Sequence, residues 1–316
     1  MTAMVEVSHL KKTFGAFTAV NDISFSVNKG EVLGFLGPNG AGKSTTMKMI
    51  TGFLTPDQGS VIVGGDNIAD NPVAVKTRIG YLPEGAPLYG DMTPVTFLRF
   101  IAEIRGLRGN EISSRIEKII SMVNLETVIN KPIETLSKGF KRRVGLAQAI
   151  LHDPEVLILD EPTDGLDPNQ KHEVRTLIQE MAPEKAIILS THILEEVNAV
   201  CSRAMVIAHG ELVADGTPAS LEARSPLHNS VELTVKSDTA DPINDALTKI
   251  PGTRSVEKIA DVNGSVSFRV YPAGEHPLLT QVSELAREKN WQVEDLHVER
   301  GKLDDVFRTI TTAQAS

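Results

Sequence analysis

Two patterns of apolar residues predict strands in the first two thirds of the chain: alternating apolar and polar positions, and continuous apolar runs. Residues 4–7 and 23–27 alternate apolar and polar side chains, which predicts short strands with one exposed face. Residues 156–159 and 186–189 are apolar throughout, as in parallel strands that are covered on both faces. The pattern predicts an α/β fold in which an antiparallel β subdomain precedes a buried parallel sheet.

Helical periodicity appears between the two kinds of strand. Apolar residues recur every three or four positions in residues 95–104 and 112–123, which predicts two amphipathic helices. Ser137 is well suited as an N-cap, so a further helix is expected from there through Ile150. The pattern therefore predicts a helical subdomain inserted between the strands.

The last third of the chain has its own order of elements. Residues 218–230 are rich in Pro, Ser and Ala, which predicts a linker. Beyond it the pattern predicts strand, helix, strand, strand, helix and strand, followed by a helix at 303–312. This is the order of the split βαβ, ferredoxin-like unit. We expect a large α/β domain at residues 1–217 and a small α+β accessory domain at 231–316.

Composition is that of a soluble globular protein. The chain has 316 residues, of which 41% are hydrophobic and 23% charged, and this length suits about two domains. The net charge of −9 argues against a general nucleic-acid surface, so no nucleic acid partner is expected. Cys201 is the single cysteine, which favours a reducing compartment. Neither a secretory signal nor an apolar run long enough to cross a membrane is evident, so a membrane role would need a partner.

Histidines in the last third carry no metal-binding spacing. They are isolated from one another in the sequence, which predicts surface or core residues instead of ligands. These histidines are His228, His276 and His297.

A glycine-rich stretch fits G-x-x-x-x-G-K-[ST], the phosphate-binding loop of nucleoside triphosphatases. Its residues, the expected nucleotide contacts, are Gly37, Pro38, Asn39, Gly40, Ala41, Gly42, Lys43, Ser44 and Thr45. A buried strand at residues 32–36 precedes the loop, and helical character follows it. Backbone N–H groups at a helix N-terminus attract an anion. Lys43 would contact the β- and γ-phosphates, and the Ser44 hydroxyl would ligate Mg²⁺. An ordinary glycine-rich turn is the alternative.

Two carboxylates follow the buried run at 156–159. They emerge at the C-terminal end of a predicted parallel strand, where α/β sheets bind their ligands. Asp160 would hold Mg²⁺ through a water molecule, and Glu161 would orient or deprotonate the attacking water. The alternative is that both acids only cap the turn before Pro162.

Several short motifs occur in a fixed order along the chain. They are the phosphate loop, Tyr81-Leu82-Pro83-Glu84, Leu136-Ser137-Lys138-Gly139, Ile158-Leu159-Asp160-Glu161, Gly165-Leu166-Asp167 and Ser190-Thr191-His192. In this order they resemble the ATP-binding subunit of ABC transporters, over about residues 4–217. The resemblance implies a P-loop NTPase fold with an antiparallel β subdomain and a helical subdomain. It also implies ATP hydrolysis coupled to transport, with ATP and Mg²⁺.

The resemblance assigns roles around the nucleotide. Phe14 falls where an aromatic side chain stacks on adenine. Glu84 falls at the loop that senses the γ-phosphate; the family usually has Gln there, so Glu84 keeps a Mg²⁺ ligand and loses an amide donor. His192 is the expected switch histidine, which bonds the γ-phosphate and supports Glu161. Together with Lys43, these two residues form the expected catalytic set.

The resemblance also predicts a dimer. Ser137 and Gly139 fall at the signature contacts to the γ-phosphate held by the other subunit, and Asp167 falls at an acid of the dimer interface. Lys138 and Phe140 stand where the family more often has Gly and Gln. A homodimer or heterodimer of ATP-binding subunits is therefore expected, joined by ATP and opened by hydrolysis.

A narrower resemblance is to the ABC-2 type exporter ATPases, and within them to the gliding-motility-associated ATP-binding subunit. It rests on residues 80–84, 136–139, 143–149 and 165–170 and on Leu303-Asp304-Asp305-Val306-Phe307. It implies an integral membrane permease as partner and a peripheral location on the cytoplasmic face of the cell (inner) membrane. The permease would dock on the helical segment at 84–107.

Two other functions stay open at this point. One is an ABC ATPase that acts as a mechanical or regulatory switch without transport, although such proteins usually carry long coiled-coil insertions or two cassettes in one chain. The other is a soluble nucleotide kinase, which needs neither the signature at 136–139 nor His192. A neighbouring reading frame that encodes several apolar spans would separate transport from the first alternative.

Overall fold

The computed structural model describes residues 3–85, 87–237, 240–262, 264–274, 276–301 and 305–307. The chain divides into two compact units, Met1–Pro218 and Ala219–Ser316. The predicted boundary after residue 217 differs from this division by one residue, and whether each unit folds alone stays a prediction. Of the helix predicted at 303–312, only residues 305–307 are described, and they are helical; Leu303 and Asp304 lie outside the described residues.

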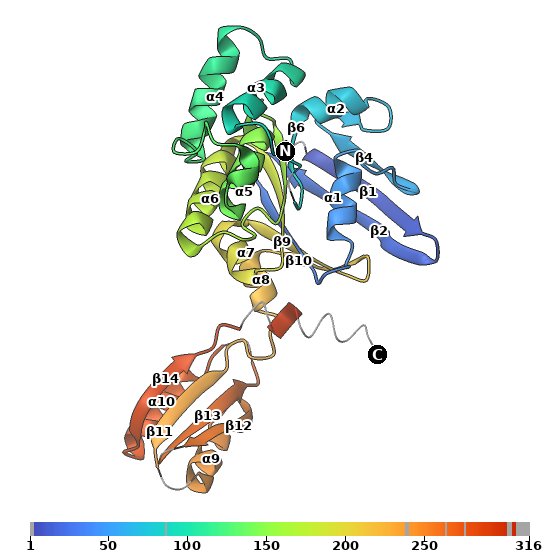
Figure 1. Ribbon diagram of the computed structural model, residues 1–316. Coiled ribbons are helices and arrows are strands. Elements are labelled where there is room, and N and C mark those ends of the chain that lie inside the picture. Colours follow the sequence, from blue (N-terminus) through green and yellow to red (C-terminus); the bar gives the residue numbers. More distant parts are fainter. Residues whose placement is uncertain are drawn as a thin grey trace. The chain divides into compact units, whose positions relative to one another are not determined.

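An antiparallel sheet forms one edge of the first unit (Figure 1). Its strands alternate buried and exposed side chains, as the sequence predicts, but the first two are long instead of short. The order is β2-β1-β4-β5. The strands are β1 (Ala3–Phe14), β2 (Phe17–Asn28), β4 (Gln58–Val63) and β5 (Asp66–Asn67).

A buried, mostly parallel sheet forms the centre of this unit, in the order β10-β9-β3-β8-β7-β6. Every residue of β3, β7 and β8 is buried, which explains the apolar runs at 156–159 and 186–189. The polar residues at the strand ends, Asp160, Ser190 and Thr191, are buried as well. Only the last strand, β10, runs antiparallel to its neighbour. The strands are β3 (Val32–Leu36), β6 (Ile79–Leu82), β7 (Val156–Asp160), β8 (Ala186–Thr191), β9 (Arg203–Ala208) and β10 (Glu211–Gly216).

Helices flank the parallel sheet, and α3 and α4 gather at the end away from the β1–β2 hairpin (Figure 1). The predicted helical subdomain is therefore present. The helices are α1 (Lys43–Ile50), α2 (Pro72–Arg78), α3 (Pro94–Ile104), α4 (Asn110–Met122), α5 (Lys138–Ile150), α6 (Pro168–Met181) and α7 (Leu194–Val200). Short 3₁₀ turns lie at Ile133–Thr135 and Ala182–Glu184. The sequence analysis missed α6.

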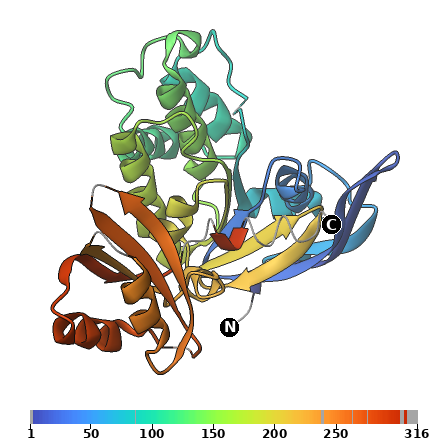
Figure 2. The same cartoon turned by 90° about the horizontal axis from the view of Figure 1, so that it is seen from below.

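The second unit has a four-stranded antiparallel sheet, in the order β12-β13-β11-β14. Buried side chains of the sheet, such as Leu233 and Phe268, form one core cluster with Leu247 and Val282 of two helices. Figure 2 shows the backbone of this unit from below. The elements are β11 (Val231–Lys236), α9 (Asp241–Thr248), β12 (Thr253–Val262), β13 (Ser265–Pro272), α10 (Leu279–Glu288) and β14 (Gln292–Val298). A short helix, α8 (Pro218–Glu222), occupies part of the expected linker.

None of the helices in the described part of the chain has both the length and the apolar character that crossing a bilayer requires.

Candidate functional site

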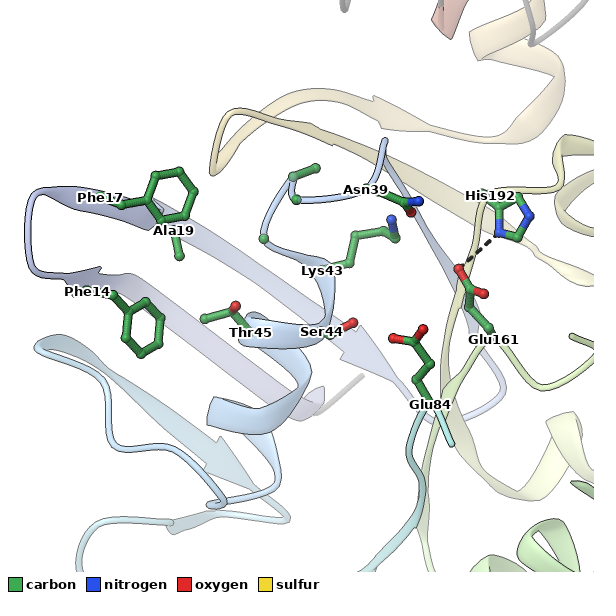
Figure 3. A pocket seen from close by; sticks show the side chains of 13 residues that line it. Phe14, Phe17, Ala19, Asn39, Lys43, Ser44, Thr45, Glu84, Glu161 and His192 are labelled. Carbon is green, nitrogen blue, oxygen red and sulfur yellow. Dashed lines mark hydrogen bonds and ion pairs between the residues drawn. The ribbon is translucent and has the colours of Figure 1, made fainter. Parts of the chain in front are cut away.

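A cavity of about 640 Å³ lies over the glycine-rich loop (Figure 3). Segments far apart in the sequence supply its walls: the β1–β2 hairpin, the loop, and the ends of β6, β7 and β8. The lining residues are Phe14, Phe17, Ala19, Asn39, Gly40, Ala41, Gly42, Lys43, Ser44, Thr45, Glu84, Glu161 and His192. The structure thus brings most of the predicted nucleotide residues together. Phe17 and Ala19 were not predicted.

The side chain of Lys43 reaches back to the first residues of the glycine-rich loop. Its ammonium donates hydrogen bonds to the carbonyl oxygens of Gly37 at 2.7 Å and Pro38 at 3.1 Å. Burial lowers the pKa of Lys43, and the nearby carboxylates of Glu161 and Asp160 oppose that shift. Gly37 and Pro38 do not line the cavity, so their described contribution is to hold the lysine.

Two loop glycines are required by their protein neighbours. A Cβ on Gly37 would lie 2.5 Å from the carbonyl oxygen of Ile207 in β9. Gly42 has a φ of 105°, and a Cβ there would lie 2.4 Å from the carbonyl oxygen of Ala19 in β2. Only glycine fits at such approaches. The loop is therefore fixed in place by two strands of different sheets.

Glu161 has a strained backbone held by hydrogen bonds to its N–H and to its carbonyl oxygen. Its φ is 50°, in the left-handed region. Its N–H donates to the backbone oxygen and to the hydroxyl of Ser190, both at 3.1 Å. Its carbonyl accepts from the Arg142 guanidinium at 2.6 Å. The carboxylate then lies at the cavity wall, with Oε1 3.0 Å from Nδ1 of His192. A strained residue fixed from both sides suits a site that must be preorganised.

Arg142 is a positioning residue that the sequence analysis missed. It is buried in α5, and its guanidinium donates to several carbonyl oxygens at once. These oxygens belong to Pro83, Asp160, Glu161 and Pro162. Burial lowers the pKa of Arg142, while the acids around it act in the opposite direction. One side chain thus ties the segment before Glu84 to the turn after β7. No sequence motif marked it, because its partners are backbone atoms.

Asp160 lies behind the cavity wall. Its side chain is buried and accepts a hydrogen bond from the Ser190 hydroxyl. Ser44 and Glu84 line the cavity and offer oxygen atoms, the ligands that Mg²⁺ prefers. The donor set therefore fits Mg²⁺, and the buried position of Asp160 suits a contact through water better than direct ligation.

The predicted signature residues lie apart from the cavity lining. Ser137 caps α5 by accepting from the Phe140 N–H at 3.4 Å, and Asp167 caps α6 by accepting from the Gln170 N–H at 3.0 Å. A Cβ on Gly139 would lie 2.4 Å from Oε1 of Gln170, so the two helix starts are in close contact. They form a second cluster of predicted residues within the same unit.

Two aromatic rings lie at the end of the cavity away from Glu161 (Figure 3). Phe14 and Phe17 are partners across the β1–β2 hairpin and are half exposed or more. The ammonium of Lys12 lies 5.8 Å from the Phe14 ring centroid. Rings with a free face can stack on a nucleotide base. Phe17 could have been found from its place in the hairpin that carries Phe14.

His297, in the second unit, lies at the surface, as predicted, and has three carboxylates around it. Its Nδ1 lies 2.8 Å from Asp295, and its Nε2 lies 3.8 Å from Glu232 and 3.9 Å from Glu299. Arg269 already donates to Glu232, so the charges form a mixed surface network. Strand pairing brings Glu232 to this network, because Glu232 and His297 are opposite each other on β11 and β14.

Comparison with known proteins agrees with this geometry. The family described as ABC transporter matches residues 20–164. The linearmycin resistance ATP-binding protein LnrL of Bacillus subtilis (strain 168) is 34% identical over 312 residues, which cover 98% of each chain. The Nod factor export ATP-binding protein I of Cupriavidus pinatubonensis is 31% identical over 313 residues, 98% of this chain and 91% of that protein.

A solved structure has the same fold as the first unit. It is the dimeric post-hydrolysis state of the ATP-binding cassette MJ0796 bound to ADP and Pi, with a TM-score of 0.64 and 22% identity. The match covers 68% of this chain and 99% of that cassette. At this identity the likeness speaks for the fold alone.

Proposed function

The chain belongs to the ABC transporter family, and from this premise we propose that it powers an export-type membrane permease from the cytoplasmic face of the cell membrane. It is the ATP-binding and ATP-hydrolysing subunit of such a transporter. Two relatives that align over nearly its whole length are named for linearmycin resistance and Nod factor export, which supports export. The narrower gliding-motility resemblance stays a prediction.

Nucleotide binding uses the two ends of the cavity. Phe14, with Phe17 beside it, stacks on the base. The loop at the start of α1 offers its N–H groups to the phosphates, where the helix dipole favours negative charge. Lys43 exchanges its bonds to the Gly37 and Pro38 carbonyls for the β- and γ-phosphate oxygens. The bonds to the two carbonyl oxygens satisfy the buried ammonium when no nucleotide is bound.

Ser44 and Glu84 are the residues that would hold Mg²⁺, with Asp160 contributing through water. When bound, the ion neutralises phosphate charge. Glu84 and Glu161 both line the cavity, so two carboxylates face the same end of the triphosphate.

Hydrolysis depends on the pair formed by Glu161 and His192. The carboxylate of Glu161 accepts a proton from, or orients, the attacking water. His192 bonds Glu161 through Nδ1, so its Nε2 is left to reach the γ-phosphate. Arg142 and Ser190 keep the carboxylate at the cavity wall throughout. This fixed pair over a phosphate loop is the observation that carries the proposal.

The complete site is composite. ABC cassettes form dimers, and the solved cassette with this fold is a dimer bound to ADP and Pi. Ser137, Gly139 and Asp167 lie outside the cavity of their own chain. We assign Ser137 and Gly139 to the γ-phosphate site of a second subunit, where the N-terminus of α5 offers donors to the anion, and Asp167 to the interface between the subunits. The second subunit is either another copy of this chain or a related ATP-binding subunit.

The permease docks on the segment at 84–107. Within it three large apolar side chains are exposed, and two of them, Tyr89 and Phe100, lie edge to face with ring centroids 5.8 Å apart. Their exposed fractions are 53% for Tyr89, 36% for Phe100 and 64% for Ile104. The second unit, with its βαββαβ order and its antiparallel sheet, is proposed to be a ferredoxin-like accessory domain.

Size measurement on the full chain tests the composite site. With MgATP, the Glu161→Gln protein is expected to become dimeric on a light-scattering column, because ATP binds and is not hydrolysed. Ser137→Arg in the same background is expected to stay monomeric, since Arg obstructs the partner's γ-phosphate. A dimer in both proteins would refute the signature assignment. Co-purification of the wild-type chain with a membrane protein that stimulates its ATPase activity tests the transport role.

A further inference from the structure

Glu196 is a buried carboxylate that the catalytic scheme leaves unused. It lies in α7, four residues after His192, and its side chain is 2% exposed. It does not line the nucleotide cavity. Removing a carboxylate from water is costly unless hydrogen bonds and opposite charges compensate it. Its partners therefore indicate why the chain keeps an acid there.

Two threonine hydroxyls donate to the two oxygens of this carboxylate. Thr191 donates to Oε2 at 2.9 Å, and Thr163 donates to Oε1. Both threonines are buried. Thr191 directly precedes His192, and Thr163 lies two residues after Glu161. One carboxylate is thus bonded to both segments that carry the catalytic pair.

A third segment reaches the same carboxylate from α6. Nζ of Lys171 lies 3.9 Å and Nη2 of Arg175 lies 3.8 Å from Oε1 of Glu196. These cations compensate the buried charge, and they stand one helical turn apart. Asp167, at the N-cap of α6, is the acid assigned to the interface with a second subunit. Glu196 therefore contacts the switch segment, the turn after β7 and the helix that begins at the proposed interface.

We propose that Glu196 is a positioning residue that holds His192 against Glu161 and links this pair to the interface helix α6. The inference rests on the proposed function. Rotation of α6 in a forming dimer moves Lys171 and Arg175, and the carboxylate passes that movement to both threonines. His192 then contacts the γ-phosphate only when α6 has taken its position in the dimer interface. A purely structural role would stabilise the fold without this effect on turnover.

Glu196→Gln in the full chain is the first test. The amide keeps the shape and one acceptor, but it loses the charge and the second acceptor. We expect kcat to fall at least tenfold, while KM and the ATP dissociation constant change less than threefold. Glu195→Gln is the matched control, because Glu195 is the exposed neighbour on the same helix. It should leave kcat unchanged.

Thr163→Val and Thr191→Val provide the second test, since each removes one hydroxyl and leaves the charge in place. Each should lower kcat without a matching change in KM, and each should have little further effect when combined with Glu196→Gln. Additive losses in the combined variants would overturn the proposal. The proposal would also be overturned if kcat fell in proportion to the melting temperature across all variants.

Glu161→Gln separates this inference from the proposed function. If it abolishes turnover while a folded Glu196→Gln protein turns over normally, the positioning role is wrong and the catalytic assignment stands. If Glu161→Gln leaves turnover intact, the catalytic assignment itself has failed. If Glu196→Gln does not fold, the two valine variants decide the question alone.

Discussion

Nδ1 of His192 lies 3.0 Å from Oε1 of Glu161. The two residues come from neighbouring parallel strands, β8 and β7, and each stands just beyond its strand end. Because parallel strands end at the same edge of a sheet, the residue after β7 and the residue after β8 lie close together there. The pair is thus a direct consequence of strand order, and its orientation is set by Arg142 and Ser190.

Glu161→Gln should abolish ATP turnover and leave ATP binding intact. The amide cannot accept a proton, yet it can keep the contact with His192. Phosphate release and nucleotide binding by fluorescence would be measured on the same preparation. Unchanged turnover would show that Glu161 is not the base. Glu155→Gln, a surface acid at the other end of β7, is the control.

His192→Ala should lower kcat by about 10²–10³-fold, the loss seen when one preorganised donor is removed from a developing charge. Affinity for ATP should change much less, because Lys43 and the loop N–H groups remain. Steady-state kinetics on His192→Ala and on His172→Ala, an exposed histidine of α6, make the comparison. Equal activity in the two proteins would exclude His192 from the mechanism.

Gly42→Ala should destabilise the first unit by about 2–4 kcal/mol, since a clash with a backbone oxygen adds to the cost of a positive φ. The Cβ would lie 2.4 Å from the Ala19 oxygen. Gly15→Ala is the matched control: its φ is 58°, and nothing lies within 4 Å of the added Cβ. It should cost only about 1 kcal/mol. Urea unfolding that gives equal losses would show that the close approach carries no energy.

The sequence predicts the site well wherever the chemistry lies in one continuous stretch. The phosphate loop and the buried run ending in Asp160 and Glu161 fall where they were expected, because strand–turn–helix order is local. The helix α6 also had a local signal, with Asp167 as cap and Pro168 at its first position.

The remaining parts of the site depend on contacts between segments. Arg142 bonds backbone oxygens, and Glu196 joins the hydroxyl of the nearby Thr191 to that of Thr163, which is 33 residues away. Neither pattern can be read along the chain. His297 shows the same limit for one neighbour: Asp295 and Glu299 are two residues away in the sequence, but Glu232 comes from a paired strand. Side chains that act through tertiary contacts leave no spacing in the sequence.

Deletion of residues 230–316 should spare ATP binding by the first unit. The nucleotide cavity and its described supporting contacts all lie within Met1–Pro218. Equilibrium binding of a fluorescent ATP analogue to the truncated chain measures this, and Lys43→Ala in the same truncation sets the background. A folded truncation that binds no better than that background would show that the domain boundary is misplaced.

Acid should destabilise the first unit through His152. Burial, aided by the positive charge of Arg105, lowers the pKa of His152 from 6.5 to about 4. In the unfolded chain His152 is therefore protonated near pH 6.5, whereas in the folded chain it is protonated only near pH 4. Stability from this group is fully present above pH 6.5 and is lost as the pH falls through that window. Between pH 7.5 and 5 the loss should be about 1–2 kcal/mol.

His152→Gln isolates that contribution. The amide can still donate to the Ile79 carbonyl, which lies 3.1 Å from Nε2 in the native chain, but it does not titrate. Urea unfolding at pH 7.5 and 5 should give a smaller acid loss for His152→Gln than for the native protein, by about 1–2 kcal/mol. His172→Gln, at an exposed position, should behave like the native chain. If all three proteins lose the same stability, His152 is protonated in the folded state and the acid sensitivity arises from other groups.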